Sequence, residues 1–162
     1  MGQGVALIGF MGSGKSTLGS SLAKRLESRF CDLDGFIEQR EGLTVELLFE
    51  QRGEVGFREA ERLALEASLA NTSQVLACGG GTPCQNGLMD ALLEWGSVIF
   101  LDVPFEDLKR RTMDGRPLWN AKAEALYAQR RPVYERAHIR LDGTLSPEVL
   151  LEAAVQCLEM RT

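Results

Sequence analysis

The chain has 162 residues, a length that fits a single domain. Hydrophobic residues make up 44% of it and charged residues 25%, the ordinary mixture of a globular protein. Its formal net charge is −5, which argues against non-specific binding to nucleic acid or to an anionic membrane, because an acidic surface repels phosphate groups. An anionic substrate would therefore have to be held by a local basic cluster.

Neither a membrane span nor an export signal is indicated by the sequence. No apolar stretch approaches the roughly 20 residues that a span needs, and no basic region precedes the apolar run Val5–Phe10. The four cysteines contain no CxxC pair, so reduced thiols are expected in place of a disulfide framework or a zinc site. We expect a cytoplasmic monomer that has no nucleic-acid or membrane partner.

Short apolar runs alternate with helical patterns along the chain. Val5–Ile8 is entirely apolar, as in a strand that is buried on both faces. The next apolar residues are spaced by four, which predicts one stripe of a helix: Leu18, Leu22, Leu26 and Phe30. Further apolar runs span residues 74–78, 98–101 and 138–141, and helical patterns span 46–49, 59–69, 87–95 and 105–112. This alternation predicts an α/β fold with a parallel sheet covered by helices, closed by a last helix that Ser146 would cap.

A glycine-rich loop joins the first predicted strand to the first predicted helix. The pattern GxxxxGK[ST] is matched by Gly9, Gly14, Lys15 and Ser16. Glycines allow successive backbone N–H groups to turn towards phosphate oxygens, and the following helix adds the positive end of its dipole. Lys15 would neutralise the β- and γ-phosphates of a nucleoside triphosphate, and the Ser16 hydroxyl would bind Mg²⁺.

Two aspartates lie where a strand after the first helix should end. In open parallel sheets this carboxyl edge is where ligands bind. One carboxylate of Asp32 and Asp34 could meet Mg²⁺, and the other could accept or orient the proton of a substrate hydroxyl. A solvated acidic turn is the alternative, and the neighbouring phosphate loop favours the functional interpretation.

Arginines and a second run of glycines complete the candidate site. Arg58, Arg116 and Arg136 are each suited to a bidentate contact with carboxylate or phosphate, although a single arginine is more often a surface charge. Gly79–Gly81 ends a buried run, and three glycines in succession lose more backbone entropy on folding than other residues. A close approach by a ligand or by another backbone segment would explain them better than a flexible loop.

Taken together, these motifs make the chain resemble the shikimate kinases over nearly its whole length. The resemblance rests on GFMGSGKST, on Asp32-x-Asp34, on Gly53-Glu54-x-x-Phe57-Arg58-x-x-Glu61, on the three glycines, and on two later motifs, Arg116-Pro117-Leu118 and Arg131-Pro132-x-Tyr134-x-x-Ala137. It implies a three-layer αβα sandwich whose five-stranded parallel sheet has the order 2-3-1-4-5. It also implies one P-loop kinase domain over residues 1–162, with a substrate-binding segment at about 33–61 and a lid at about 112–124.

The same resemblance implies the activity and the roles of individual residues. The γ-phosphate of ATP would be transferred to the 3-hydroxyl of shikimate, with Mg²⁺ bound by Ser16 and Asp32. Catalysis would involve Lys15, Asp34 and Arg116. The nucleotide would contact Gly12, Ser13, Gly14, Lys15, Ser16, Thr17, Arg111 and Arg116, with Arg111 or Arg110 against the adenine. Shikimate would contact Asp34, Arg58, Gly80, Gly81 and Arg136, between the apolar walls Phe49 and Phe57.

Three other functions share part of this pattern. A gluconate kinase would use the same phosphate loop but needs a polyol pocket, and the pair Arg58 and Arg136 favours a compact carboxylate. A GTPase would need an NKxD guanine motif, which the sequence does not contain. A regulator that has lost catalysis would not be expected to retain Lys15, Asp34 and Arg116 together.

Overall fold

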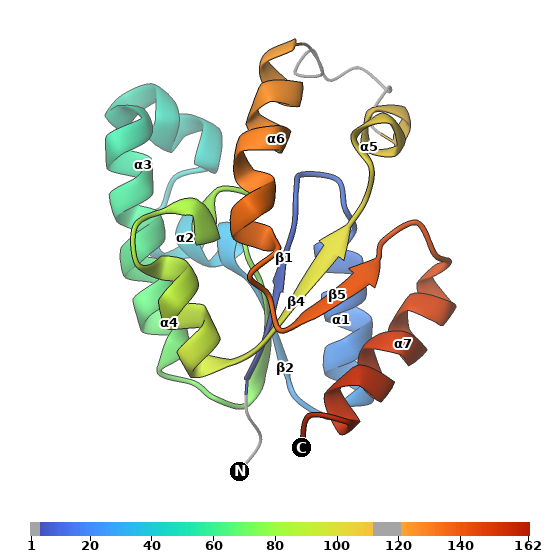
Figure 1. The fold of residues 1–162 in the computed structure, drawn as a ribbon. Coiled ribbons are helices and arrows are strands. Elements are labelled where there is room, and N and C mark those ends of the chain that lie inside the picture. Colours follow the sequence, from blue (N-terminus) through green and yellow to red (C-terminus); the bar gives the residue numbers. More distant parts are fainter. Residues whose placement is uncertain (1–3, 112–120) are drawn as a thin grey trace.

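Five parallel strands form the centre of the protein. The computed structural model describes residues 4–111 and 121–162. The strands are β1 (Gly4–Ile8), β2 (Arg29–Asp32), β3 (Gln74–Ala77), β4 (Gly96–Asp102) and β5 (Ile139–Asp142), and the sheet order is β2-β3-β1-β4-β5 (Figure 1). β1 pairs with β3 on one side and with β4 on the other. The predicted strand order is thereby confirmed.

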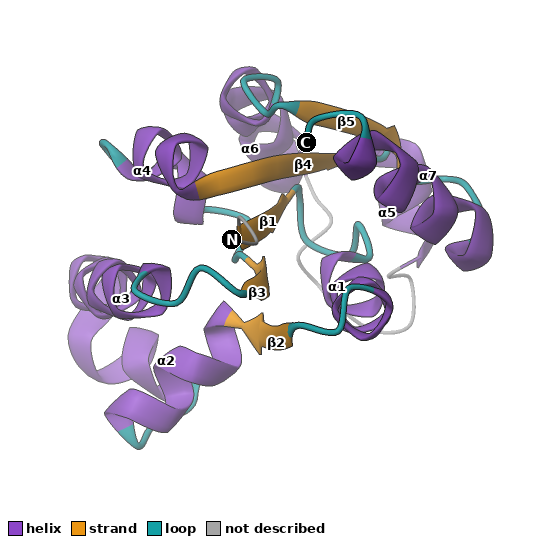
Figure 2. Ribbon diagram, turned by 90° about the horizontal axis from the view of Figure 1, so that it is seen from below, coloured by secondary structure: helices purple, strands orange, loops and turns teal. Residues whose placement is uncertain are grey.

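Helices cover both faces of this sheet, which confirms the three-layer sandwich. Because side chains alternate along a strand, Ala6 and Ile8 of β1 face one layer and Val5 and Leu7 face the other. The first layer contains α2 (Leu33–Glu41), α3 (Val45–Leu69), α4 (Leu88–Trp95) and α6 (Ala121–Tyr134), and the second contains α1 (Lys15–Arg25) and α7 (Pro147–Glu159) (Figure 2). A short helix α5 (Phe105–Arg111) and a 3-10 turn η1 (Thr82–Cys84) complete the described elements. Both layers bury apolar side chains against the sheet, which explains why the central strand β1 is entirely apolar, whereas the edge strands β2 and β5 also carry charged residues.

Some predicted boundaries were wrong. α1 ends at Arg25, and Phe30 belongs to β2, not to the helical stripe. Two predicted helices merge into α3, in which Gly53 has φ 68° and interrupts the regular turn. The predicted final helix is confirmed: the Ser146 hydroxyl accepts a hydrogen bond from the Val149 N–H at 3.4 Å.

The single histidine has a structural contact. Nδ1 of His138 accepts a hydrogen bond from the Val98 N–H at 3.1 Å, which joins the start of β5 to β4. Separately, none of the helices formed by the described residues combines the length and the apolar character needed to cross a bilayer.

Candidate active site

The polar motifs meet at one edge of the sheet. The glycine loop follows β1, Asp32 ends β2, the three glycines follow β3 and Asp102 ends β4. All four strands are parallel, so their carboxyl ends lie on the same edge, at the end of the molecule opposite both termini (Figure 1). This is the edge where open α/β sheets bind ligands.

The phosphate loop has the curled backbone that its glycines allow. Gly9, Gly12 and Gly14 all have positive φ, and Gly14 leads directly into α1. Lys15 is the first residue of α1, and its Nζ donates to the carbonyl oxygens of Gly9 at 2.8 Å and Phe10 at 2.9 Å. Burial lowers the pKa of Lys15 to about 8. The loop thus holds one cation beside the open N-terminus of a helix.

The predicted metal ligands lie side by side. The Ser16 hydroxyl donates to Oδ2 of Asp32 at 2.6 Å, and Oδ1 of Asp32 accepts from the Gly35 N–H at 3.3 Å at the start of α2. A hydroxyl and a carboxylate are hard oxygen donors of the kind Mg²⁺ prefers, and Mg²⁺ commonly takes its other ligands from water and phosphate. The donor set therefore fits Mg²⁺ bound together with a nucleotide.

Asp34 faces the same cavity as the phosphate loop. It lies in the first turn of α2, and the cavity is lined by Lys15, Asp32, Asp34 and Gly79, among others. Partial burial raises the pKa of Asp34; the negative charges of Asp32 and Glu61 act in the same direction, and Lys15 opposes them. A carboxylate with a raised pKa, next to a phosphate loop, is suited to accept a proton from a hydroxyl.

Arg58 and Gly81, the last of the three glycines, line a second pocket, while Gly79 and Gly80 line the loop cavity together with Asp34. An ideal Cβ on Gly81 would lie only 2.6 Å from Nη2 of Arg58, so a side chain there would displace the guanidinium. Arg58 is held by Glu61, whose side chain is 1% exposed and whose Oε1 lies 2.7 Å from Nη1. Oε2 of Glu61 accepts from the Thr82 hydroxyl at 2.8 Å. The glycines therefore make room for an arginine whose direction is fixed by a buried carboxylate.

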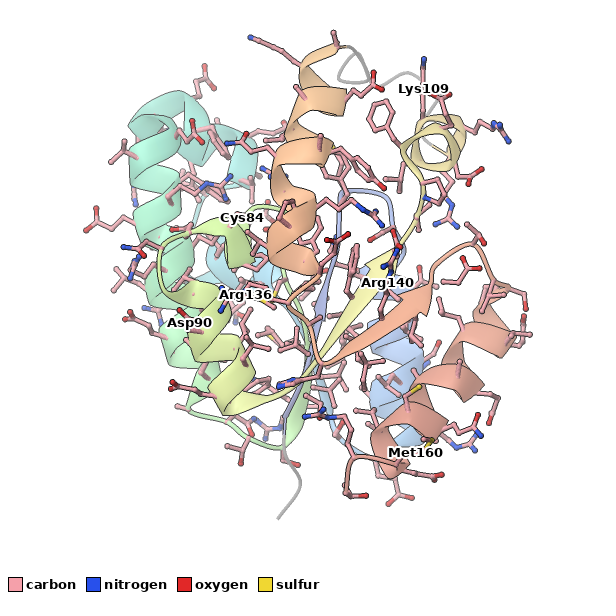
Figure 3. All side chains as sticks on the ribbon, in the orientation of Figure 1. Cys84, Asp90, Lys109, Arg136, Arg140 and Met160 are labelled. Atoms are coloured by element: carbon pink, nitrogen blue, oxygen red, sulfur yellow. The ribbon has the colours of Figure 1, made fainter. Side chains whose placement is uncertain are left out.

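The structure does not bring Arg136 to this pocket. Arg136 follows α6 and forms an ion pair with Asp90 of α4, where both side chains are largely exposed (Figure 3). Arg130 of α6 lines the pocket in its place, together with Arg58 and Gly81. An ideal Cβ on Gly80 would lie 3.0 Å from Nη1 of Arg130. The arginine that sequence reasoning missed therefore precedes the one it selected by six residues in the chain.

A separate cavity adjoins the other side of the phosphate loop. It is lined by Ser13, Gly14, Thr17, Arg111, Gly143 and Leu145, among others. Nη2 of Arg111 donates to the Gly143 carbonyl at 2.6 Å, and Nη1 lies 3.4 Å from the carbonyl oxygens of Gly12 and Ser13. This places the predicted adenine contact, Arg111, beside the phosphate loop.

The predicted apolar walls, Phe49 and Phe57, stack with ring centroids 4.4 Å apart. Arg116 and residues 112–120 of the predicted lid lie outside the described residues.

Fold and site together define a P-loop kinase, with a phosphate loop, an acidic pair and an adjoining basic pocket on one sheet edge. The family model for shikimate kinase matches residues 11–159. The chain therefore belongs to the shikimate kinase family.

Similar proteins span the whole chain. The shikimate kinase of Sulfurihydrogenibium sp. is 35% identical, over 98% of this chain and 99% of that protein. The crystal structure of the shikimate kinase from Aquifex aeolicus is 34% identical, with a TM-score of 0.90 over 97% of this chain and 96% of that one. The shikimate kinase from Acinetobacter baumannii in complex with shikimate is 32% identical, with a TM-score of 0.93 over 100% of this chain and 96% of that one.

Proposed function

We propose that the protein transfers the γ-phosphate of ATP to the 3-hydroxyl of shikimate, giving shikimate 3-phosphate and ADP for aromatic amino-acid biosynthesis. One observation carries this proposal: Gly80 lies between Arg130 and the phosphate loop, since an ideal Cβ on it would be 3.0 Å from Nη1 of Arg130 and 3.6 Å from the Met11 N, and Asp34 lines the loop cavity with Gly80. Two arginines match a compact carboxylate, and Asp34 matches a hydroxyl on the same small molecule. The local positive charge explains how an acidic protein can bind an anionic acid.

The chain's own residues supply positioning and charge balance. The loop amides and Lys15 hold the phosphates, while Arg58 and Arg130 hold the carboxylate so that the hydroxyl faces the γ-phosphorus in line. Asp34 accepts or orients the hydroxyl proton. Mg²⁺ would be bound by Ser16 and Asp32, where it would balance negative charge on the phosphates. Arg116 is proposed to approach the transferring group from the lid at about 112–124.

The assay for this function compares acceptors. We expect ADP release from ATP to be stimulated strongly by shikimate and hardly at all by D-gluconate or by buffer alone. Stimulation by gluconate alone would favour a polyol kinase, and the absence of stimulation by shikimate would overturn the proposal. We also propose that the protein is cytoplasmic and monomeric. Sedimentation of the purified protein tests the monomeric state.

The choice between Arg130 and Arg136 gives a direct mutational test. Arg130→Ala removes a charge-assisted contact worth about 2 kcal/mol, so we expect KM for shikimate to rise roughly thirtyfold and KM for ATP to change little. Arg58→Ala should behave in the same way. Arg136→Ala breaks only an exposed ion pair with Asp90 and should leave both KM values within about twofold. The reverse result, with only Arg136→Ala defective, would restore the assignment made from sequence.

A further inference from the structure

Two adjacent arginines on α6 point to different parts of the active-site edge. Arg130 lies beside Gly80 and over the Phe10 ring, 5.7 Å from its centroid. Arg131 instead contacts Asp102 at the end of β4. Successive residues differ by about 100° around a helix, so fixing the direction of one arginine also fixes the direction of the other.

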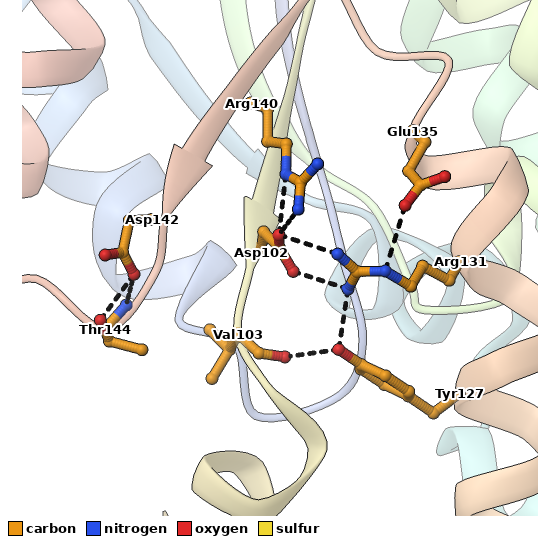
Figure 4. Close-up of polar contacts among 8 residues, drawn as sticks. All are labelled: Asp102, Val103, Tyr127, Arg131, Glu135, Arg140, Asp142 and Thr144. Atoms are coloured by element: carbon orange, nitrogen blue, oxygen red, sulfur yellow. Dashed lines mark hydrogen bonds and ion pairs between the residues drawn. The ribbon is translucent and has the colours of Figure 1, made fainter.

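Asp102 is the centre of a polar cluster between the sheet and α6 (Figure 4). Its carboxylate accepts two hydrogen bonds from Arg131, at 2.7 and 3.0 Å, and one from Nε of Arg140 at 2.8 Å. The Asp102 side chain is 15% exposed and that of Arg131 is 28% exposed, so this pair is screened less than a surface pair. Hydrogen bonding by Arg131 keeps the pKa of Asp102 below its usual range. The carboxylate therefore stays charged at neutral pH.

Two tyrosines attach α6 to the sheet edge, one before Arg130 in the chain and one after it. The Tyr127 hydroxyl accepts from Arg131 at 2.8 Å and donates to the Val103 carbonyl at 2.9 Å. About two turns after Tyr127, the Tyr134 hydroxyl donates to the Gly80 carbonyl at 2.5 Å. Arg130 lies between these two attachment points. A bidentate pair constrains the rotation of the helix more than a single hydrogen bond does.

We propose that Asp102 is a positioning residue for the acceptor site: through Arg131 it sets the rotation of α6 so that Arg130 points at the carboxylate of the substrate. Asp102 itself lines neither the loop cavity nor the pocket that contains Arg58 and Arg130. The inference rests on the proposed function, since it gives Arg130 the role described there. The ion pair between Asp102 of β4 and Arg131 of α6 then contributes to substrate binding as well as to stability.

Asp102→Asn tests the proposal because an amide keeps the size of the side chain but loses the charge and one acceptor. We expect KM for shikimate to rise about tenfold, since a small displacement of a binding group is enough for such a loss. KM for ATP should stay within about twofold, because the side-chain partners of Asp102 are Arg131 and Arg140 and not residues of the phosphate loop. Asp102→Glu, which retains a carboxylate, should recover part of the loss.

Two controls separate positioning from stability. Asp90→Asn breaks another carboxylate–arginine pair, at the chain segment just after α6, and should leave both KM values unchanged. The double variant Asp102→Asn with Arg130→Ala should have nearly the same KM for shikimate as Arg130→Ala alone, since residues that act through one another are not additive. A stability defect alone would lower the active fraction and the thermal midpoint without changing either KM.

The outcomes distinguish this inference from the proposed function. A wild-type KM for shikimate in Asp102→Asn, or additive effects in the double variant, would overturn the positioning role and leave the proposed function intact. Wild-type enzyme that shows no shikimate-dependent ADP release would overturn the proposed function, and the positioning role would fall with it.

Discussion

Replacing Lys15 with alanine is expected to lower kcat by about a thousandfold, comparable with the loss of a preorganised group that stabilises charge in a transition state. Lys15 is the only side-chain ammonium among the residues that line the loop cavity in the described structure. Its Nζ is already held at the loop by two carbonyl oxygens, so little reorganisation is needed when phosphates bind. The rate should be measured as ADP release at saturating shikimate.

Lys24→Ala is the matched control for Lys15→Ala. Lys24 lies in the last turn of the same helix and is exposed, at the end away from the phosphate loop. We expect its kcat and both KM values to stay close to those of the wild type. Comparable losses in the two variants would mean that the defect comes from damage to α1 and not from the missing ammonium at the phosphates.

The pH dependence of ATP use gives a second readout for Lys15. Burial lowers its pKa to about 8, and the protonated form is the one that attracts phosphate. In the wild type, kcat/KM for ATP should therefore fall as the pH rises through about 8, because this ratio reports groups of the free enzyme. Lys15→Ala should lack this fall. A wild-type profile that is flat across that pH range would contradict the role of the ammonium.

The elements nearest the phosphate loop could be predicted from sequence because their signals are local. An apolar run, a glycine pattern and a lysine followed by serine together define β1, the loop and the start of α1. Asp32 was expected where a strand after the first helix should end, and it does end β2, although the predicted helix ran too far, to Phe30. Three consecutive glycines indicated a close approach, and the structure supplies its physical reason in the guanidinium of Arg58 against Gly81.

Arg130 was missed because its direction depends on a helix that the sequence marks weakly. α6 contains Pro132 and buries only Ala123 and Tyr134 among its fourteen residues, so it has little of the periodicity that reveals a helix. In a helix that continues as far as Tyr134, one face carries Leu126, Arg130 and Val133. Arg136 lies after the end of that helix, and its side chain pairs with Asp90 of α4.

Contacts between distant segments could not be predicted from patterns at all. Glu61 accepts a hydrogen bond from the Thr82 hydroxyl, and Asp102 joins β4 to Arg131 of α6, but nothing in the sequence beside either carboxylate indicates its distant partner. α2 was also not predicted, since Leu33 and Ile37 are its only fully buried residues. These features depend on which surfaces the sheet brings together, and a single sequence does not contain that information.

Asp34→Asn should lower kcat by about 10² to 10⁴ if Asp34 accepts the proton of the attacking hydroxyl, the range typical of general base catalysis. The amide is nearly isosteric and can still orient a hydroxyl, so KM for shikimate should change much less than kcat. The variant is measured by ADP release, with calorimetric titration of shikimate to show that binding persists. Glu41→Gln, at the far end of α2, is a control in which both quantities should remain unchanged.

The pH profile separates proton transfer from orientation. Burial, Asp32 and Glu61 raise the pKa of Asp34, and the active form is the carboxylate. In the wild type, kcat/KM for shikimate should therefore fall as the pH drops through a value above the ordinary aspartate pKa of about 3.9. Asp34→Asn has no proton to gain there, so its profile should lose this acidic limb. If the variant keeps both the limb and most of the rate, Asp34 only orients the hydroxyl, and the hydroxyl proton passes to an oxygen of the transferred phosphoryl group while ADP leaves.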